Sequence, residues 1–164
     1  MANTRFNRTL SDLFETQPDN PTIFEDPFDA TATIESNAIM FQRLIRYSTI
    51  VKDHQSAMLN AYYLGYLLRN RATMKEAKRC RKTINKHYVH TSQRIYRLYS
   101  ILGPEQIYRS RRSTLTTFTR LSENELARLV EEATNIIAGA INLEGEVVTL
   151  PITEDLPNIS DHLI

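Results

Sequence analysis

The residues with the clearest chemical potential in this sequence are cationic, and they are concentrated in one stretch. Between Arg69 and Arg112 the chain has thirteen Lys or Arg residues and two acidic residues, a net charge of +11. Cationic side chains at this density favour contacts with phosphate groups or with acidic protein surfaces. The residues predicted to make such contacts are Arg69, Arg71, Lys75, Lys78, Arg79, Lys82, Arg109, Arg111 and Arg112.

The remainder of the chain has the opposite charge. We call residues 69–112 the basic block. Outside it there are seven basic and seventeen acidic residues, so the formal net charge of the whole chain is +1. Two blocks of opposite charge indicate either that the protein binds both acidic and basic partners, or that one block folds against the other. A protein that only coats DNA does not need this much compensating acid.

Residues that could support catalysis or metal binding are few. His87 and His90 lie three residues apart, and Cys80 lies seven residues before His87, but no second Cys pair or supporting carboxylate accompanies them. The four glycines are not clustered, which excludes a glycine-rich phosphate loop. We therefore expect a non-catalytic protein with no cofactor and no metal.

Length and composition are typical of one folded domain with a tail. The chain has 164 residues, 41% of them apolar, and a single cysteine, so no intramolecular disulfide is possible. No apolar run approaches the roughly 18 residues of a membrane span, and the N-terminus lacks the apolar core of a signal peptide. We expect an intracellular protein without membrane contact, nuclear in a eukaryote and cytoplasmic or nucleoid-associated otherwise.

The basic block must be positioned by helices. Apart from Gly65, residues 61–102 contain no helix breaker, which predicts a single long helix or two abutting helices. One stripe of this stretch is apolar and recurs at spacings of four and three: Ile84, Tyr88, Thr91, Ile95, Leu98 and Leu102. We predict that Ile95, Leu98 and Leu102 pack against the last helix of the chain and extend into a contact with another chain.

Other helices are indicated by periodicity and caps. Residues 33–69 predict one amphipathic helix capped by Thr33, in which Gly65 either produces a kink or admits a neighbouring helix. Residues 106–120 are rich in Ser and Thr and predict a connector. Ser122 and Glu125 have the spacing of a capping box and predict the start of the last helix.

The predicted fold class is all-α or mainly α, an elongated bundle of about four helices with a short C-terminal β segment. We expect an acidic, weakly ordered arm at residues 1–33, a helical domain at 34–142, and a short strand with an acidic tail at 143–164. Phe24 and Phe28 in the arm could dock on a basic groove, or pack locally on the domain.

The C-terminal segment is predicted to bind a partner. The alternation of side-chain types around residues 146–150 is typical of a strand. A lone strand needs a neighbouring strand to satisfy its backbone hydrogen-bonding groups. We therefore predict a protein interface that includes Val148, Leu150, Ile152 and Leu156.

Several segments of the chain together resemble the subunits of the GINS replication complex in which an α-helical domain precedes a small β domain. The similar segments are Leu67-Leu68-Arg69-Asn70-Arg71, residues 94–99, residues 121–126 with 129–132, and Val148 to Ile152 followed by Glu154-Asp155-Leu156-Pro157. The resemblance implies a non-catalytic subunit that joins the MCM motor to other partners at a replication fork, through helix packing with sister subunits.

Two functions follow from these patterns. We expect a scaffold subunit of a multiprotein nucleic-acid-processing assembly, within a hetero-oligomer. The alternative is a small viral or chromosomal helical protein that binds DNA or RNA without sequence specificity through residues 69–112. Tyr88, Tyr96, Tyr99 and Tyr108 alternate with arginines and could stack on bases, although packing within the core is the plainer interpretation.

Overall fold

The structure is a computed structural model, and it describes residues 9–14, 27–111 and 114–139. These residues form a mainly helical fold, as predicted, whereas the predicted C-terminal β segment lies outside the described residues. The helical segments in chain order are η2 (Leu10–Leu13), α1 (Ile34–Ile50), α2 (His54–Tyr66), η3 (Leu67–Arg71), α3 (Met74–Thr83), α4 (Lys86–Leu102), η4 (Pro104–Arg109), α5 (Thr114–Arg120) and α6 (Glu123–Ile137).

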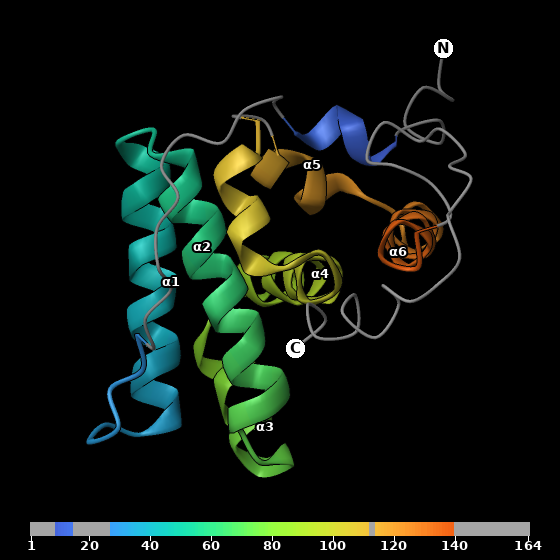
Figure 1. Cartoon of the computed structure of the whole chain (residues 1–164). Coiled ribbons are helices and arrows are strands. Elements are labelled where there is room, and N and C mark those ends of the chain that lie inside the picture. The colour runs from blue at the N-terminus through green and yellow to red at the C-terminus, as the bar shows by residue number, and fades with distance from the viewer. Residues whose placement is uncertain (1–8, 15–26, 112–113, 140–164) are drawn as a thin grey trace.

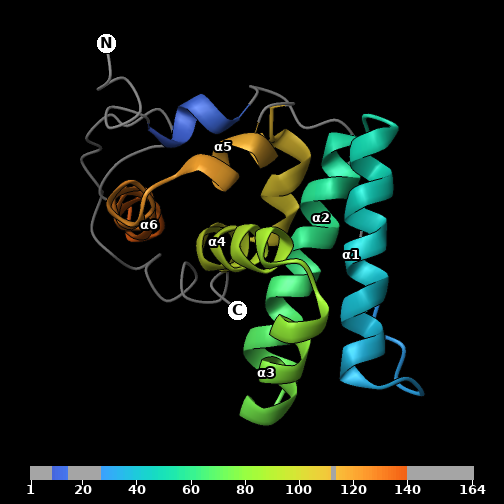
Figure 2. The ribbon, with the colours of Figure 1, turned by 180° about the vertical axis from the view of Figure 1, so that it is seen from behind.

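Two helix pairs make up the body of the molecule. The helices α1 and α2 lie side by side and run in opposite directions, and α4 crosses α2 at a steep angle (Figure 1). The helix α6 packs along α4, and both views show these two helices end-on (Figure 2). The basic helix α3 extends from the lower end of the α1–α2 pair, where much of its surface faces solvent.

The helix α4 lies at the centre of the core. Its Ile95, Leu98 and Tyr99 are fully buried, and Leu102 is 8% exposed. The helix packs against α6, as the apolar stripe predicts. The predicted extension of Ile95, Leu98 and Leu102 into a contact with another chain is wrong, because the chain's own helices already cover these side chains.

The close contact between α2 and α4 depends on Gly65. A Cβ atom at this position would lie 2.4 Å from the backbone oxygen of Ser92 and 2.5 Å from Cβ of Tyr96. Of the two predicted roles for Gly65, the structure shows the close approach of a neighbouring helix.

The prediction of one long helix, or two abutting ones, over residues 61–102 is wrong. The stretch divides into α2, η3, α3 and α4. At the start of α3, the Thr73 hydroxyl accepts from the Glu76 N–H, and the Glu76 carboxylate accepts from the Thr73 N–H. At the start of α4, the Asn85 side chain accepts from the His87 N–H. These caps satisfy N–H groups that a continuous helix would have bonded internally.

The predicted single helix over residues 33–69 is also divided. Its start is confirmed, because the Thr33 hydroxyl accepts from the Ser36 N–H. The chain turns after α1 at Lys52, whose φ is +63°, and the Asp53 carboxylate caps α2 by accepting from the Ser56 N–H. A side-chain cap at Asp53 therefore begins a second helix that reverses direction.

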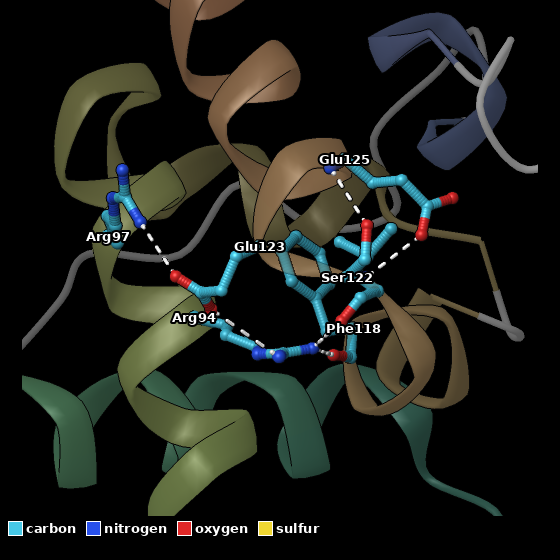
Figure 3. Close-up of polar contacts among 7 residues, drawn as sticks. Arg94, Arg97, Phe118, Ser122, Glu123 and Glu125 are labelled. Carbon is cyan, nitrogen blue, oxygen red and sulfur yellow. Dashed lines mark hydrogen bonds and ion pairs between the residues drawn. The ribbon is translucent and has the colours of Figure 1, made fainter.

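The predicted capping box at Ser122 and Glu125 is confirmed. The predicted connector over residues 106–120 is wrong, because it contains most of η4 and all of α5. The short helix α5 is stabilised by tertiary contacts: Phe118 is fully buried, and the guanidinium group of Arg94 donates to the backbone oxygens of Phe118 and Leu121 (Figure 3). Such contacts offset the low helix propensity of its threonines.

Part of the predicted N-terminal arm belongs to the folded domain. Leu10, Leu13 and Phe14 are buried in the core, so the domain begins well before the predicted boundary at residue 34. Phe28 packs locally against Phe41, with ring centroids 5.3 Å apart, which is the second of the two alternatives predicted for this residue. Phe24 lies outside the described residues.

Candidate cationic binding surface

The helix α3 presents a dense group of cationic side chains to solvent. Ala77 and Cys80 are buried beneath the helix, so its remaining surface is free for charged residues. Five basic side chains of this helix are exposed: Lys75, Lys78, Arg79, Arg81 and Lys82. We call this set the α3 basic face.

Acidic side chains of the described residues do not neutralise the α3 basic face. None of its five members forms an ion pair with a described residue. Two carboxylates lie at this helix: Glu76, which accepts from the Thr73 N–H, and Glu35 of α1, which accepts from the Thr83 hydroxyl, and the five cations outnumber them. The positive potential of this helix therefore extends into solvent, where it attracts anions.

A groove lies between α3 and α4, beside the α3 basic face. Its volume is about 930 Å³, and its lining includes the apolar side chains of Leu68 and Ile101. Four cationic side chains also line it: Arg69, Lys78, Arg81 and Arg97. The groove thus combines an apolar component with convergent positive charge, which suits an extended anionic chain.

The structure brings together five of the predicted contact residues. Lys75, Lys78, Arg79 and Lys82 lie on α3, and Arg69 lines the adjoining groove. Arg71 is close to them in sequence, but its guanidinium group lies over the Phe28 ring, 4.4 Å from the centroid.

Arg109 and Arg111 are not part of this group. Arg109 lies over the Phe14 ring at 5.6 Å from the centroid. The Arg111 side chain donates from Nε to the Phe14 backbone oxygen at 2.8 Å, and its backbone N–H donates to Leu13. Figure 1 shows η2 at the end of the molecule opposite α3. Arg112 lies outside the described residues.

Two groove residues, Arg81 and Arg97, were missing from the predicted contact residues. Arg81 follows Lys78 by three positions, so helical spacing alone places both on one side of α3 and could have identified it. Arg97 lies on α4, and its membership depends on how α3 and α4 pack. No local sequence signal gives that packing.

Two of the four predicted tyrosines, Tyr96 and Tyr99, pack within the protein, which agrees with the plainer prediction for these two. Tyr99 is fully buried, its hydroxyl lies 2.7 Å from Oγ of Ser110, and burial raises its pKa above the usual value. The Tyr96 ring lies 5.4 Å from the Tyr62 ring, and its hydroxyl accepts from Asn70 at 2.7 Å. These rings are engaged in aromatic contacts that base stacking would disrupt.

The predicted C-terminal interface residues, Val148, Leu150, Ile152 and Leu156, lie outside the described residues.

Within the described ranges, no group of three His, Cys, Asp or Glu side chains could hold a metal ion. Cys80 is buried, which raises the pKa of its thiol. In the same part of the chain, no helix combines the length and apolar character needed to cross a membrane.

Comparisons of this chain with known protein families, with curated proteins and with solved structures gave no match. The resemblance to GINS subunits therefore stays a prediction. What the chain can bind has to be inferred from the chemistry of its own surface.

Proposed function

We propose that this protein is a non-catalytic nucleic-acid-binding protein whose α3 basic face and adjoining groove contact the phosphate backbone. The observation that carries the proposal is the group of five exposed basic side chains on α3, none of which pairs with an acid of the described residues. Such a surface binds a polyanion by releasing the counterions condensed on it.

The contact is proposed to be independent of base sequence. Tyr96 and Tyr99 are held in packing contacts, which leaves the phosphates as the main target. Lysine and arginine side chains lie on several sides of α3, so they could contact a phosphate backbone that approaches from more than one direction. Affinity should consequently be modest and should fall steeply with added salt.

The direct test uses fluorescence anisotropy with labelled single-stranded and duplex oligonucleotides at low salt. Replacing Lys78 and Arg81 together by Gln should weaken binding about tenfold, because two phosphate contacts are lost. Both side chains are exposed, so the fold should be retained, which the thermal midpoint checks.

The matched control replaces Arg46 and Arg128 by Gln. Both residues are exposed and lie outside α3, on α1 and α6, and the change in net charge is the same. Equal weakening in the two variants would mean that net charge, not the α3 basic face, attracts the oligonucleotide. Absence of binding by the unmodified protein at low salt would overturn the proposal outright.

A scaffold subunit of a nucleic-acid-processing assembly, similar to a GINS subunit, is the second candidate. One observation favours it: α1 exposes several large apolar side chains, as a subunit that packs on sister subunits would. This role is compatible with nucleic-acid binding. A purified chain that stays monomeric and has no stable protein partner when co-expressed with replication proteins would count against it.

A further inference from the structure

The outer side of α1 exposes apolar side chains that the fold leaves uncovered. Leu44, Tyr47, Ile50 and Val51 are 39%, 63%, 67% and 49% exposed. Among the described residues, the other large apolar side chain with comparable exposure is Met74, on α3. Exposed apolar surface in the described part of the chain is thus concentrated at one end of α1.

The opposite side of α1 already forms part of the core. Ala38, Phe41 and Ile45 are buried, and α2 covers this side. Figures 1 and 2 show α1 at the edge of the molecule, with α2 on its inner side. A group of exposed apolar side chains on the side of a helix that faces away from the core often marks an interaction site. The fold covers α1 on one side.

A hollow continues the exposed surface toward the start of α1. Ser36, Ile39, Met40, Arg43 and Leu44 line it, and its volume is about 490 Å³. Leu44 belongs both to this hollow and to the exposed apolar group. From Ile39 to Val51 the surface extends about 18 Å along the helix. We call this surface the α1 outer face.

The charge beside the α1 outer face is mainly positive. Arg43 and Arg46 are exposed on α1, and Lys52 follows the helix, whereas the neighbouring Asp53 carboxylate caps α2 by accepting from the Ser56 N–H. The acidic residue of α1, Glu35, accepts a hydrogen bond from the Thr83 hydroxyl of α3. A ligand that covers the apolar side chains would therefore gain from carboxylates placed near the two arginines.

We propose that the α1 outer face binds an amphipathic helix of another protein, one whose apolar stripe is bordered by Asp or Glu residues. A surface about 18 Å long matches three to four turns of such a helix, and the hollow around Met40 can receive one of its side chains. Leu44, Tyr47 and Ile50 supply the apolar contact, and Arg43 and Arg46 favour a ligand with carboxylates beside its apolar stripe.

Two other occupants fit less well. In a second copy paired through the same face, Arg43 and Arg46 of both copies would meet, and the one carboxylate of α1, Glu35, already accepts a hydrogen bond from Thr83. An anionic bilayer would satisfy the arginines, but its surface cannot fill the hollow beside Met40 as a protein side chain can. The proposed occupant goes beyond nucleic-acid binding and does not depend on it.

The test is a selection from a displayed library of 18-residue helical peptides, with the full chain as bait. Each peptide carries leucines along one helical stripe and random residues on its flanks. The selected peptides should be enriched in Asp and Glu on the flanks. Their affinity should fall at least about tenfold for bait with Tyr47→Gln and Ile50→Gln, because each change removes apolar contact area. It should also fall for bait with Arg43→Gln and Arg46→Gln.

Two control baits separate this site from the α3 basic face. Met74→Gln removes an apolar side chain outside α1 that is even more exposed, at 85%, and Lys78→Gln with Arg81→Gln removes charge from α3. Both baits should bind the selected peptides unchanged. Loss of binding on the α3 bait, no acidic enrichment, or no enrichment at all would overturn the proposal.

Two further measurements assign the face if another occupant binds it. Sedimentation that shows a dimer dispersed by the Tyr47 and Ile50 changes would assign the face to a second copy and overturn the proposal. Binding to phosphatidylserine vesicles that is lost in the same variant, with no peptide selected, would assign it to a bilayer and overturn it equally.

Discussion

Arg94 connects three helices through one buried guanidinium group. It lies on α4, 8% exposed, and its Nη1 donates to the backbone oxygens of Phe118, at 3.2 Å, and Leu121 (Figure 3). Its Nη2 lies 3.5 Å from the Glu123 carboxylate at the start of α6. Carbonyl groups at the end of a helix have no hydrogen-bond donor within that helix. Arg94 therefore supplies the donor for the carbonyl groups at the end of α5.

Replacing Arg94 by Met should lower the free energy of unfolding by about 2–4 kcal/mol, because two buried carbonyl groups would lose a charged donor. Urea denaturation followed by circular dichroism measures this change. The ion pair with Glu123 should contribute little of the loss, because the Glu123 side chain is 71% exposed.

Arg97 provides the matched control. Its Nη1 lies 3.7 Å from the same Glu123 carboxylate, but its own side chain is 49% exposed. Arg97→Met should therefore cost less than about 1 kcal/mol. Similar costs for the two variants would show that the Arg94 contacts with α5 do not stabilise the fold.

Glu132 should make the stability of the fold depend on pH. Its carboxylate on α6 accepts from the Leu10 N–H at 3.2 Å. Burial raises its pKa above the usual 4.5, and this effect exceeds the opposite effect of the hydrogen bond. The folded protein therefore holds this proton more tightly than the unfolded chain does, so the associated stability is present at low pH and is lost as pH rises above about 4.5.

Glu132→Gln removes the titrating group and keeps an oxygen that can accept from Leu10. Relative to this variant, the unmodified protein should lose stability as the pH rises from below about 4.5 toward neutral. Parallel urea denaturation series at several pH values measure the difference. A constant difference across this range would contradict the raised pKa.

At the scale of the helices, Gly65 sets the distance between α2 and α4. Gly65→Ala would place a methyl group 2.4 Å from a backbone oxygen of α4, which cannot move without shifting the helix. Overpacking of this kind costs about 1–3 kcal/mol. Thermal unfolding should show a lower midpoint. A raised midpoint would mean that the gain in helix propensity outweighs the clash, and that α2 and α4 are not in close contact here.

Helix starts were predictable where the signal is local. Thr33 and Ser122 cap their helices as the sequence indicates, since each cap involves residues within one turn. The start of α3 was missed, although Thr73 and Glu76 have the same spacing as Ser122 and Glu125. Residues on both sides of Thr73 favour helix formation, so the composition of this stretch does not indicate that one helix ends and another begins there. The short helix α5 could not be predicted, because it depends on Arg94 from another helix.

The binding surface was predicted in part for the same reason. Charge density along the chain indicated α3, where consecutive basic residues lie on one exposed element. It also indicated Arg109 and Arg111, which instead contact the segment around Phe14. Arg97 joins the groove through tertiary packing alone. Density along the sequence thus identified the cationic helix, but it did not show which cations share a surface.

At the scale of the whole molecule, two different surfaces lie on neighbouring helices. The α3 basic face carries charge without apolar area, apart from Met74, and the α1 outer face carries apolar area with two flanking arginines. These helices contact each other, yet their proposed ligands differ in chemistry. The protein could therefore hold a nucleic acid and a protein helix at the same time, as a linking subunit must.

The most direct test of the account is the salt dependence of duplex DNA binding. The logarithm of the association constant should fall linearly with the logarithm of salt concentration, with a slope of about −0.9 for each phosphate contacted. Lys78→Gln with Arg81→Gln should make this slope less steep by about 1.8, and Arg46→Gln with Arg128→Gln should leave it unchanged. An unchanged slope in the α3 variant would show that the α3 basic face does not contact phosphate, and would contradict the proposed function.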